Sequence, residues 1–151
     1  MRHLPRVPAV LKLELAGDSP GDSWLRAATA DGPLALYHFA PLQAAVLSGE
    51  RVPFAAHWPE HLRLFVYAYV PLVALKPTQL LPDSPQDFGV RGRDHGGLRP
   101  WDQLTYRAWP LYLCTLDTPG LPPAGEVPHL FERVSPRLFP LPPPGCAGLG
   151  P

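Results

Sequence analysis

The most specific motif in the sequence is a pair of histidines around a glutamate. The string His57-Trp58-Pro59-Glu60-His61 fits the H-x-x-E-H pattern of inverted zinc peptidases. In such sites both imidazoles bind the metal from one face of a helix, and the glutamate polarises the zinc-bound water. Pro59 opposes this geometry, because proline is accepted only in the first turn of a helix. We therefore expect a turn here, and we predict no metal site and no catalytic set.

A loop rich in glycine and arginine, residues 88–101, is the second segment that could bind a ligand. Its candidate residues are Arg91, Arg93, Arg99 and Trp101. Guanidinium groups pair with phosphate in a bidentate manner, glycine lets the backbone approach a ligand closely, and an indole ring stacks on a base. The loop lacks the glycine spacing of a P-loop or a dinucleotide site. The alternative to nucleotide binding is a solvated loop whose arginines pair with nearby aspartates.

An aromatic row precedes this loop in the chain. Phe65, Tyr67 and Tyr69 occupy alternate positions of the apolar stretch 62–70. We expect this stretch to be a strand, either a central one covered on both faces or one with an exposed aromatic face. Alternating rings form the stacking platform of sheet-based single-strand binders, so Tyr67 and Tyr69 are candidate ligand-binding residues. The alternative is that the rings pack against another segment or subunit.

One further histidine belongs to a segment that resembles a known enzyme family. Leu36-Tyr37-His38-Phe39, followed by Leu42 and Val46-Leu47-Ser48-Gly49, is similar to the strand-then-helix opening of ADP-ribosyltransferase-type domains. The resemblance implies NAD as a cofactor, with His38 in contact with it. The family's catalytic glutamate has no clear match, since the only glutamates after residue 60 are Glu126 and Glu132. The alternative, which we prefer, is an ordinary strand histidine beside a hairpin and no cofactor.

Composition limits the kind of protein to which these residues can belong. The chain has 151 residues with 13 Lys and Arg against 13 Asp and Glu, so its net charge of zero excludes a polyanion binder held by overall charge. Its 23 prolines, about three times average usage, oppose a helical bundle. Cys114 and Cys146 are too few for a disulfide framework, and the sequence shows no signal peptide or bilayer-spanning stretch. We expect a cytoplasmic protein.

Periodicity and turn residues predict the elements that position the candidate residues. Strands are expected over residues 10–15, 23–30, 34–39, 62–70 and 104–116, the last interrupted by Pro110. Asp31-Gly32 predicts a two-residue hairpin turn, residues 41–47 a short helix, and residues 76–100 a long loop. No repeat of a fixed period is present. The expected core residues are Leu11, Leu13, Leu15, Leu36, Leu64, Val66, Val70, Leu111, Leu113 and Leu116.

These elements predict an α+β, β-dominated fold. We expect a single antiparallel or mixed sheet, or a partly open barrel, of about five to six strands with one or two short helices and a proline-rich C-terminal segment. Residues 1–139 would form one β-rich domain, and residues 140–151 a proline- and glycine-rich tail.

The function that we expect is that of a small soluble, non-catalytic interaction or accessory module that self-associates. Its partner would be another protein or a second copy, without a membrane. One alternative is a single-stranded nucleic-acid or nucleotide-binding protein that uses the Arg/Gly/Trp loop and the aromatic strand face. The other is an NAD-dependent ADP-ribosyltransferase-like enzyme.

Overall fold

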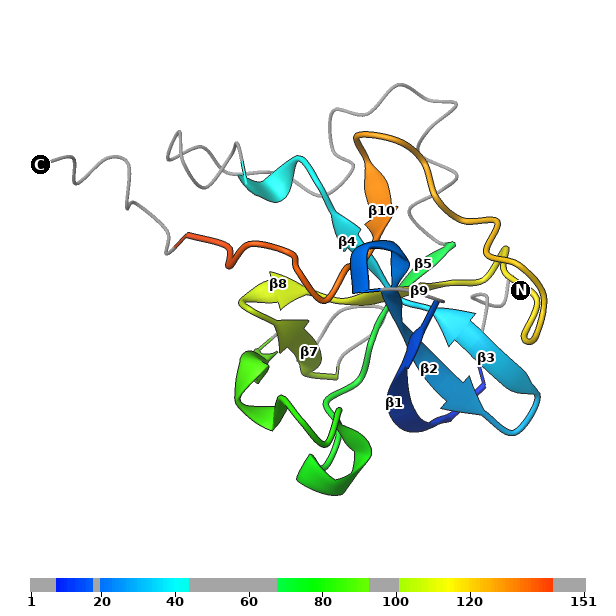
Figure 1. The fold of residues 1–151 in the computed structure, drawn as a ribbon, viewed down its shortest axis with the longest axis horizontal. Helices are drawn as coiled ribbons and strands as arrows, with labels where there is room; N and C mark the ends of the chain where they lie inside the picture. Colours follow the sequence, from blue (N-terminus) through cyan, green and yellow to red (C-terminus); the bar gives the residue numbers. More distant parts are fainter. Residues whose placement is uncertain (1–7, 18–19, 44–67, 93–100, 143–151) are drawn as a thin grey trace, which may run out of the picture.

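The structure is a computed structural model that describes residues 8–17, 20–43, 68–92 and 101–142 (Figure 1). Within these ranges the chain is β-dominated, with short 3-10 turns and only residues 42–43 in α-helical conformation. Residues 44–47 of the expected helix lie outside the described residues. The strands are β1 (Val10–Ala16), β2 (Trp24–Thr29), β3 (Gly32–Ala35), β4 (Tyr37–Phe39), β5 (Tyr69–Pro71), β6 (Phe88–Arg91), β7 (Gln103–Tyr106), β8 (Trp109–Pro110), β9 (Tyr112–Cys114) and β10 (Phe131–Arg133). The 3-10 turns are η1 (Pro20–Asp22), η3 (Pro77–Gln79) and η4 (Pro85–Asp87).

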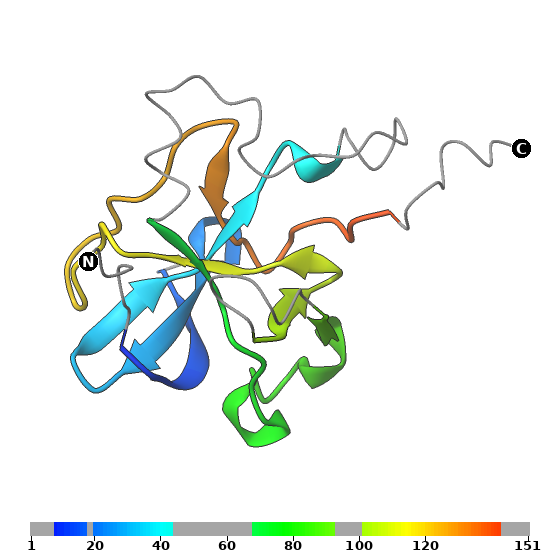
Figure 2. The ribbon, with the colours of Figure 1, turned by 180° about the vertical axis from the view of Figure 1, so that it is seen from behind.

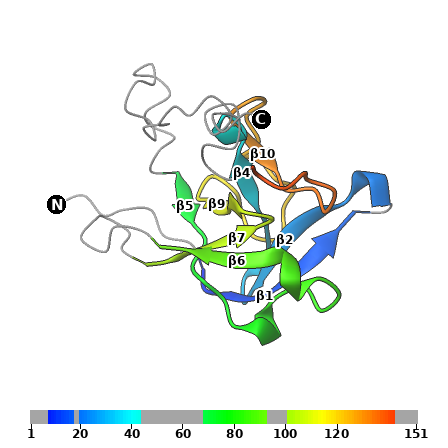
Figure 3. The ribbon, with the colours of Figure 1, turned by 90° about the vertical axis from the view of Figure 1, so that its left-hand side faces the viewer.

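The strands form three small antiparallel sheets, so the expected single sheet of five to six strands is wrong. Their orders are β1-β2-β3, β10-β4-β9-β5 and β6-β7-β8. In Figure 1 the first and third sheets flank the strands of the central sheet, and Figure 3 shows β6 at the outside of the third. Strand β6 lies inside the stretch 76–100, which is therefore not the continuous loop that its glycines and prolines predicted.

Two repeats of one strand pattern explain this topology. Each repeat has three antiparallel strands followed by one strand of the central sheet, namely β1–β3 with β4 and β6–β8 with β9. The fifth strands are exchanged, because β5 of the first repeat pairs with β9, and β10 of the second pairs with β4. The repeats meet where β4 pairs with β9, through the equivalent residues Tyr37 and Tyr112. The chain thus contains an internal repeat, with hairpins and connections of unequal length, that has no fixed period in the sequence.

The register of the strands confirms the equivalence of the two repeats. In the first repeat Ala27 pairs with Leu34 across β2 and β3, as Tyr106 pairs with Trp109 across β7 and β8 in the second. The fifth strands meet as well, because the rings of Tyr69 in β5 and Phe131 in β10 stack at 3.7 Å with an interplanar angle of 6°. The two halves are therefore related by an approximate two-fold axis.

A closed ring of three backbone hydrogen bonds lies at the centre of each half. In the first ring the amide of Leu36 donates to the carbonyl of Leu25 (3.1 Å), Leu25 donates to Val134 (2.8 Å), and Val134 donates back to Leu36 (3.1 Å). Leu36 is the residue between β3 and β4, so the expected strand 34–39 is two strands that belong to different sheets. The ring satisfies the buried backbone groups at this crossing.

The second ring repeats this arrangement with different residues. Leu111 donates to Leu104 (3.1 Å), Leu104 donates to Leu72 (2.8 Å), and Leu72 donates to Leu111 (2.9 Å). Leu111 separates β8 from β9 as Leu36 separates β3 from β4. The expected strand 104–116 is therefore broken into β7, β8 and β9, as Pro110 indicated. All six residues of the two rings are buried in one hydrophobic cluster.

Five of the expected core residues are buried, and three are exposed. Leu13, Leu36, Val70, Leu111 and Leu113 are buried. Three expected core residues are more than half exposed: Leu11, Leu15 and Leu116. Two lie outside the described residues: Leu64 and Val66.

Strand β1 shows why alternation misled. It is the edge strand of its sheet, and the register of β1 against β2 shifts between Val10 and Lys12, which leaves Leu11 as the extra residue. Leu13 lies over the core, whereas Leu15, which alternation places on the same face, is 51% exposed. Alternation assigns each side chain to one face of the sheet, but it does not show which residues of that face are buried by other elements.

The two hairpins use different turns. In the first, Ala30 and Asp31 form the turn and Gly32, with φ of +125°, is already paired with Thr29, so the turn lies one residue before the predicted Asp31-Gly32. In the second, Arg107 and Ala108 form the turn with φ of +48° and +69°. Positive φ at both central residues is the pattern of a type I′ turn.

Replacing Ala108 with glycine is expected to stabilise the protein. A non-glycine residue in the left-handed region costs roughly 1–2 kcal/mol, and glycine removes most of that cost at the expense of unfolded-state entropy. We expect Ala108→Gly to raise the free energy of unfolding by about 0.5–1 kcal/mol, measured by urea denaturation. Ala30→Gly in the other turn, where φ is not positive, is the control and should lower it by a similar amount. Equal destabilisation by both variants would contradict the assigned turn.

Candidate functional site

The structure describes only part of the predicted ligand-binding set. Arg91 is exposed at the end of β6, and the half-buried Trp101 donates its indole N–H to the carbonyl of Pro71 at 2.9 Å. Tyr69 and His38 are buried. The remaining predicted candidates lie outside the described residues: Arg93, Arg99, Tyr67 and the motif at residues 57–61. Convergence of the arginines with the aromatic row therefore stays a prediction.

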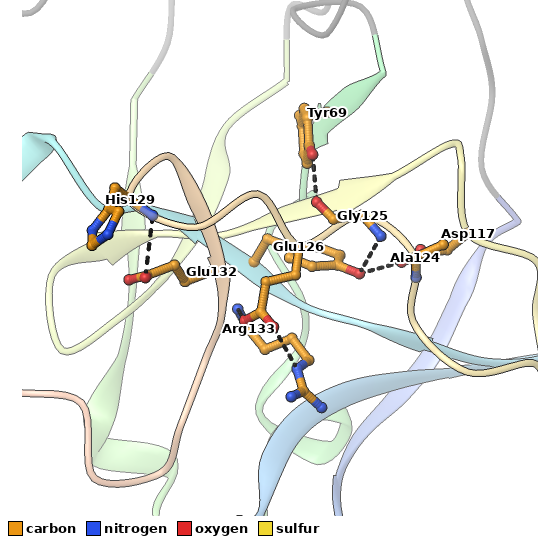
Figure 4. A network of polar contacts seen from close by, with 9 residues as sticks. Tyr69, Asp117, Ala124, Gly125, Glu126, His129, Glu132 and Arg133 are labelled. Atoms are coloured by element: carbon orange, nitrogen blue, oxygen red, sulfur yellow. Dashed lines mark hydrogen bonds and ion pairs between the residues drawn. The ribbon is translucent and has the colours of Figure 1, made fainter.

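Tyr69 does not present its ring to a ligand. One face of the ring stacks on Phe131, and its hydroxyl donates to the carbonyl of Gly125 (Figure 4). The side chain is buried in the aromatic cluster of the central sheet. Tyr69 therefore acts as a packing residue here, which was the alternative to a stacking platform.

His38 is 5% exposed and lies opposite Glu132 in the β4–β10 pair. Its Nε2 is 3.8 Å from Oε1 of Glu132, and its ring packs edge-on against Trp109 with the centroids 4.9 Å apart. Nδ1 is buried and has no hydrogen-bond partner among the described residues. Burial lowers the pKa of His38 below its ordinary value, and the Glu132 carboxylate opposes this shift. His38 is thus a buried, largely neutral imidazole whose ring is covered by Trp109 and β10.

A buried polar network ties the segment 117–125 to the central sheet. The Tyr37 hydroxyl donates to Oδ2 of Asp117 at 2.6 Å and accepts the amide of Gly125 at 3.2 Å. Oδ1 of Asp117 accepts the amide of Ala124 at 2.7 Å (Figure 4). Burial is the main cause that raises the pKa of Tyr37, with Asp117 adding to it, and burial also raises the pKa of Tyr69.

Cys114 lies against this network on β9. The position that a Cβ on Gly125 would take is 2.7 Å from its Sγ. Burial raises the pKa of the Cys114 thiol, so the thiol stays protonated at neutral pH and is a poor nucleophile. The raised pKa values of Tyr37, Tyr69 and Cys114 keep these three side chains protonated at neutral pH.

A second, more exposed set of polar contacts continues along the same segment. Glu126 and Arg133 form an ion pair at 3.5 Å, and the guanidinium of Arg133 lies 4.5 Å from the centre of the Trp24 ring. The amide of His129 donates to Oε2 of Glu132 at 3.4 Å (Figure 4). Partly exposed pairs of this kind contribute about 0–1 kcal/mol each, so they orient the segment more than they stabilise it.

The outer edge of β1 is the feature of the described chain best suited to binding. Leu25 on β2 directs its amide to Val134 and its carbonyl to Leu36, away from β1. Leu15, which lies opposite Leu25, therefore exchanges no hydrogen bond with β2. Because antiparallel pairs alternate, the amides and carbonyls of Leu13 and Leu15 point to the outer edge of the sheet. An edge strand of this kind is a template for pairing with another strand.

Side chains along β1 mark the same edge. Leu11 and Leu15 are 56% and 51% exposed, and Leu15 lies two residues from the buried Leu13 in the regular part of the strand. On the opposite face, Lys12 is exposed, while the carboxylate of Glu14 accepts a hydrogen bond from Nε of the cross-strand Arg26 at 3.0 Å. Leu11 and Leu15 were expected in the core, so this surface was not predicted from the sequence. The alternation of leucines with one basic and one acidic residue was the available signal.

Comparison with known proteins does not assign this arrangement to a family. No family model, curated protein or solved structure matches the chain. In the described part of the chain, no group of three or more His, Cys, Asp or Glu side chains is arranged to hold a metal ion. Among the same residues, no helix has the length and apolar character needed to cross a bilayer.

Replacing Gly125 with alanine is expected to destabilise the fold. The new Cβ would lie 2.7 Å from Sγ and 2.8 Å from Cβ of Cys114, so the network or β9 must shift. We expect Gly125→Ala to lower the free energy of unfolding by about 1–3 kcal/mol in urea denaturation. The control is Gly21→Ala, where an added Cβ meets nothing within 4 Å. A loss as large at Gly21 would show that the effect is not due to the contact with Cys114.

His38 is expected to make stability depend on pH. Its folded pKa is lower than its unfolded value of 6.5, so the unfolded state binds more protons between the two values. The stabilisation is complete above the unfolded pKa and declines as the pH falls towards the folded pKa. We expect His38→Phe to flatten the fall in unfolding free energy between about pH 8 and about pH 5, measured by urea denaturation at each pH.

The control for this measurement is His129→Asn. His129 is exposed and has φ of +68°, a conformation that asparagine tolerates. This variant should keep the pH dependence of the wild-type chain. An unchanged pH profile in His38→Phe would show that another group is responsible.

Proposed function

We propose that this protein is a non-catalytic interaction module that self-associates by pairing β1 with β1 of a second copy. The observation that carries the proposal is the outer edge of β1. The backbone groups of Leu13 and Leu15 point outward there, and the side chains of Leu11 and Leu15 are exposed. Pairing would join two three-stranded sheets into one across a two-fold axis. This is the isologous geometry of most homodimers.

The sequence of β1 is complementary to itself in antiparallel register. With Leu13 opposite Leu13 of the second copy, Lys12 lies opposite Glu14 of that copy. Leu15 then faces the bulged Leu11, whose carbonyl also accepts a hydrogen bond from Nε2 of Gln79 at 3.3 Å. Leu13 has outward-directed backbone groups, so the central pair exchanges two hydrogen bonds. The two Leu11–Leu15 pairs cover apolar surface that each copy exposes alone.

Charge complementarity extends beyond the two paired strands. Arg26 is cross-strand from Glu14 and bonded to it, so each half of the joined sheet carries a row of Arg26, Glu14 and Lys12 of the other copy. Opposite charges alternate along this row. Cross-strand pairs of this kind contribute about 0.2–1 kcal/mol each. A register shifted by two residues would place Lys12 opposite Lys12, or Glu14 opposite Glu14, of the second copy.

The equivalent edge β6 is a weaker candidate for self-pairing. It has four residues against seven in β1, and its only charged residue is Arg91. Two copies of β6 would therefore bring like charges close without a compensating acidic group. The length and the charge pattern together support β1 as the edge used for self-association.

The other two functions have less support from the described residues. Stacking on nucleic-acid bases needs exposed ring faces, and Tyr69 is buried against Phe131. Contact with NAD needs an accessible His38, and its ring is covered by Trp109 and β10. The protonated Cys114 thiol likewise supports a non-catalytic role.

The test is the mass of the wild-type chain and of Leu15→Lys, measured by size-exclusion chromatography with light scattering at micromolar concentrations and above. We expect the wild-type chain to form a dimer. Leu15→Lys should be monomeric, because it adds a charge at the apolar pair while leaving the core intact. Lys12→Glu, which places two acidic residues opposite each other, should weaken the dimer in the same direction.

The matched control is Leu121→Lys, because Leu121 is also an exposed leucine but lies in the segment between β9 and β10. This variant should dimerise as the wild-type chain does. A monomeric wild-type chain at the highest concentration measured would refute the proposal, and so would a dimer that survives Leu15→Lys.

A further inference from the structure

The β7–β8 hairpin holds the chain that follows β10 by its backbone carbonyls. The Tyr106 hydroxyl donates to the carbonyl of Pro136 at 2.8 Å, and the Trp109 indole N–H donates to that of Phe139 at 2.7 Å. Between them, Nη1 of Arg107 donates to the carbonyl of Leu138 at 3.0 Å. Three neighbouring donors therefore contact one short stretch of chain, which runs beside β8 in Figures 1 and 2.

The chemistry of the held segment matches that of the hairpin. The held segment, residues 136–141, has prolines at positions 136 and 140 and is followed by Pro142. Proline offers a carbonyl acceptor but no backbone N–H. The three side-chain donors suit such a segment, as in the aromatic-lined grooves that bind extended proline-rich peptides. One backbone carbonyl of the hairpin, that of Arg107, also accepts the amide of Leu141. Burial raises the pKa of Tyr106, which keeps its hydroxyl a donor. The side chain of Phe139 is 80% exposed, so recognition depends little on that side chain.

The first repeat provides an internal comparison. The residues equivalent to Tyr106 and Trp109 are Ala27 and Leu34, which occupy the same register in the β2–β3 hairpin. Neither has a side-chain donor. The common fold therefore does not require these donors, and they are a property of the second repeat alone.

The hairpin also has contacts that do not involve the C-terminal segment. The Arg107 amide donates to the carbonyl of Asp87 at 2.7 Å, and Nη2 of Arg107 lies 3.5 Å from Oδ2 of Asp87. Its guanidinium also lies 5.2 Å from the centre of the Tyr106 ring. Release of the segment would leave these contacts in place, so the donors remain arranged for another chain.

We propose that the β7–β8 hairpin is a binding site for an extended, proline-rich segment of a partner protein, which displaces the chain's own residues 136–141. The chain's own segment then acts as an intramolecular competitor. This site is distinct from the β1 edge and goes beyond the self-association proposed above.

The test uses the full-length chain and a fluorescent peptide that copies residues 135–144, with binding followed by anisotropy. The backbone amide of Leu141 donates to the carbonyl of Arg107 at 2.9 Å. Leu141→Pro removes this donor from the chain's own segment and changes no residue of the hairpin. We expect the peptide to bind this variant about fivefold more tightly than the wild-type chain, as the loss of one hydrogen bond implies.

Tyr106→Phe, added to Leu141→Pro, should weaken peptide binding about fivefold, because it removes one hydroxyl donor and keeps the ring. Arg107→Lys in the same background is the second hairpin variant and should also weaken binding. Phe139→Ala, which keeps the carbonyl and changes an exposed side chain, is the control and should match its parent. Circular dichroism checks that each variant is folded.

Three results would overturn the proposal. The peptide fails to bind Leu141→Pro, or Tyr106→Phe and Arg107→Lys bind it as well as their parent does. The third result is that Leu141→Pro forms a larger oligomer and does not bind more peptide. This would mean that two copies exchange their C-terminal segments. Repeating the binding on Leu15→Lys separates this test from the first, because that variant changes only the β1 edge.

Discussion

Two rings of backbone hydrogen bonds hold together sheets that are too short to be stable alone. Frequent prolines keep the ladders short, because each proline lacks an amide donor. Leu25 and Leu36 would then have buried, unpaired backbone groups where the chain leaves one sheet for the next. Val134 closes the ring for the first half, as Leu72 does for the second. Residues of all three sheets thus contribute to one hydrophobic cluster, beside the aromatic cluster of the central sheet, and the rings satisfy the backbone groups between the sheets.

Local signals in the sequence predicted the positions of several strands, but not of β6 or β10. The arrangement of the strands depends on pairings between residues far apart in the chain, which the sequence does not reveal. The alternation over 10–15 and the turn residues near 31 located β1, β2 and the first hairpin. The repeat was not visible because the two halves keep few identities. Tyr37 and Tyr112 are the same residue type, whereas Tyr69 is matched by Phe131. What the repeats share is a register of apolar positions interrupted by hairpins and connections of unequal length, and such a pattern has no period.

The candidate sites were harder to predict than the strands. Chemistry-bearing side chains such as His38 and Tyr69 stand out in a sequence, but their burial depends on β10, which is far away in the chain. The features that the structure favours are instead made of backbone groups. An outward-directed amide at Leu13, or a carbonyl at Leu138 that receives a guanidinium, has no signature in residue type. Sequence patterns could suggest the charge alternation of β1, but not which edge of the strand is open.

The exchange of fifth strands also governs the order in which the chain can fold. Strand β4 pairs with β10, so Tyr37 cannot pair with Arg133, its partner in the register, until β10 has been synthesised. During synthesis the N-terminal half leaves the ribosome well before residue 134, and its first backbone ring stays open until then. Pairings this distant in sequence carry a large loop-closure cost and slow the search for the native state. The β4 edge consequently stays open to chaperones and to other growing chains until β10 has been made.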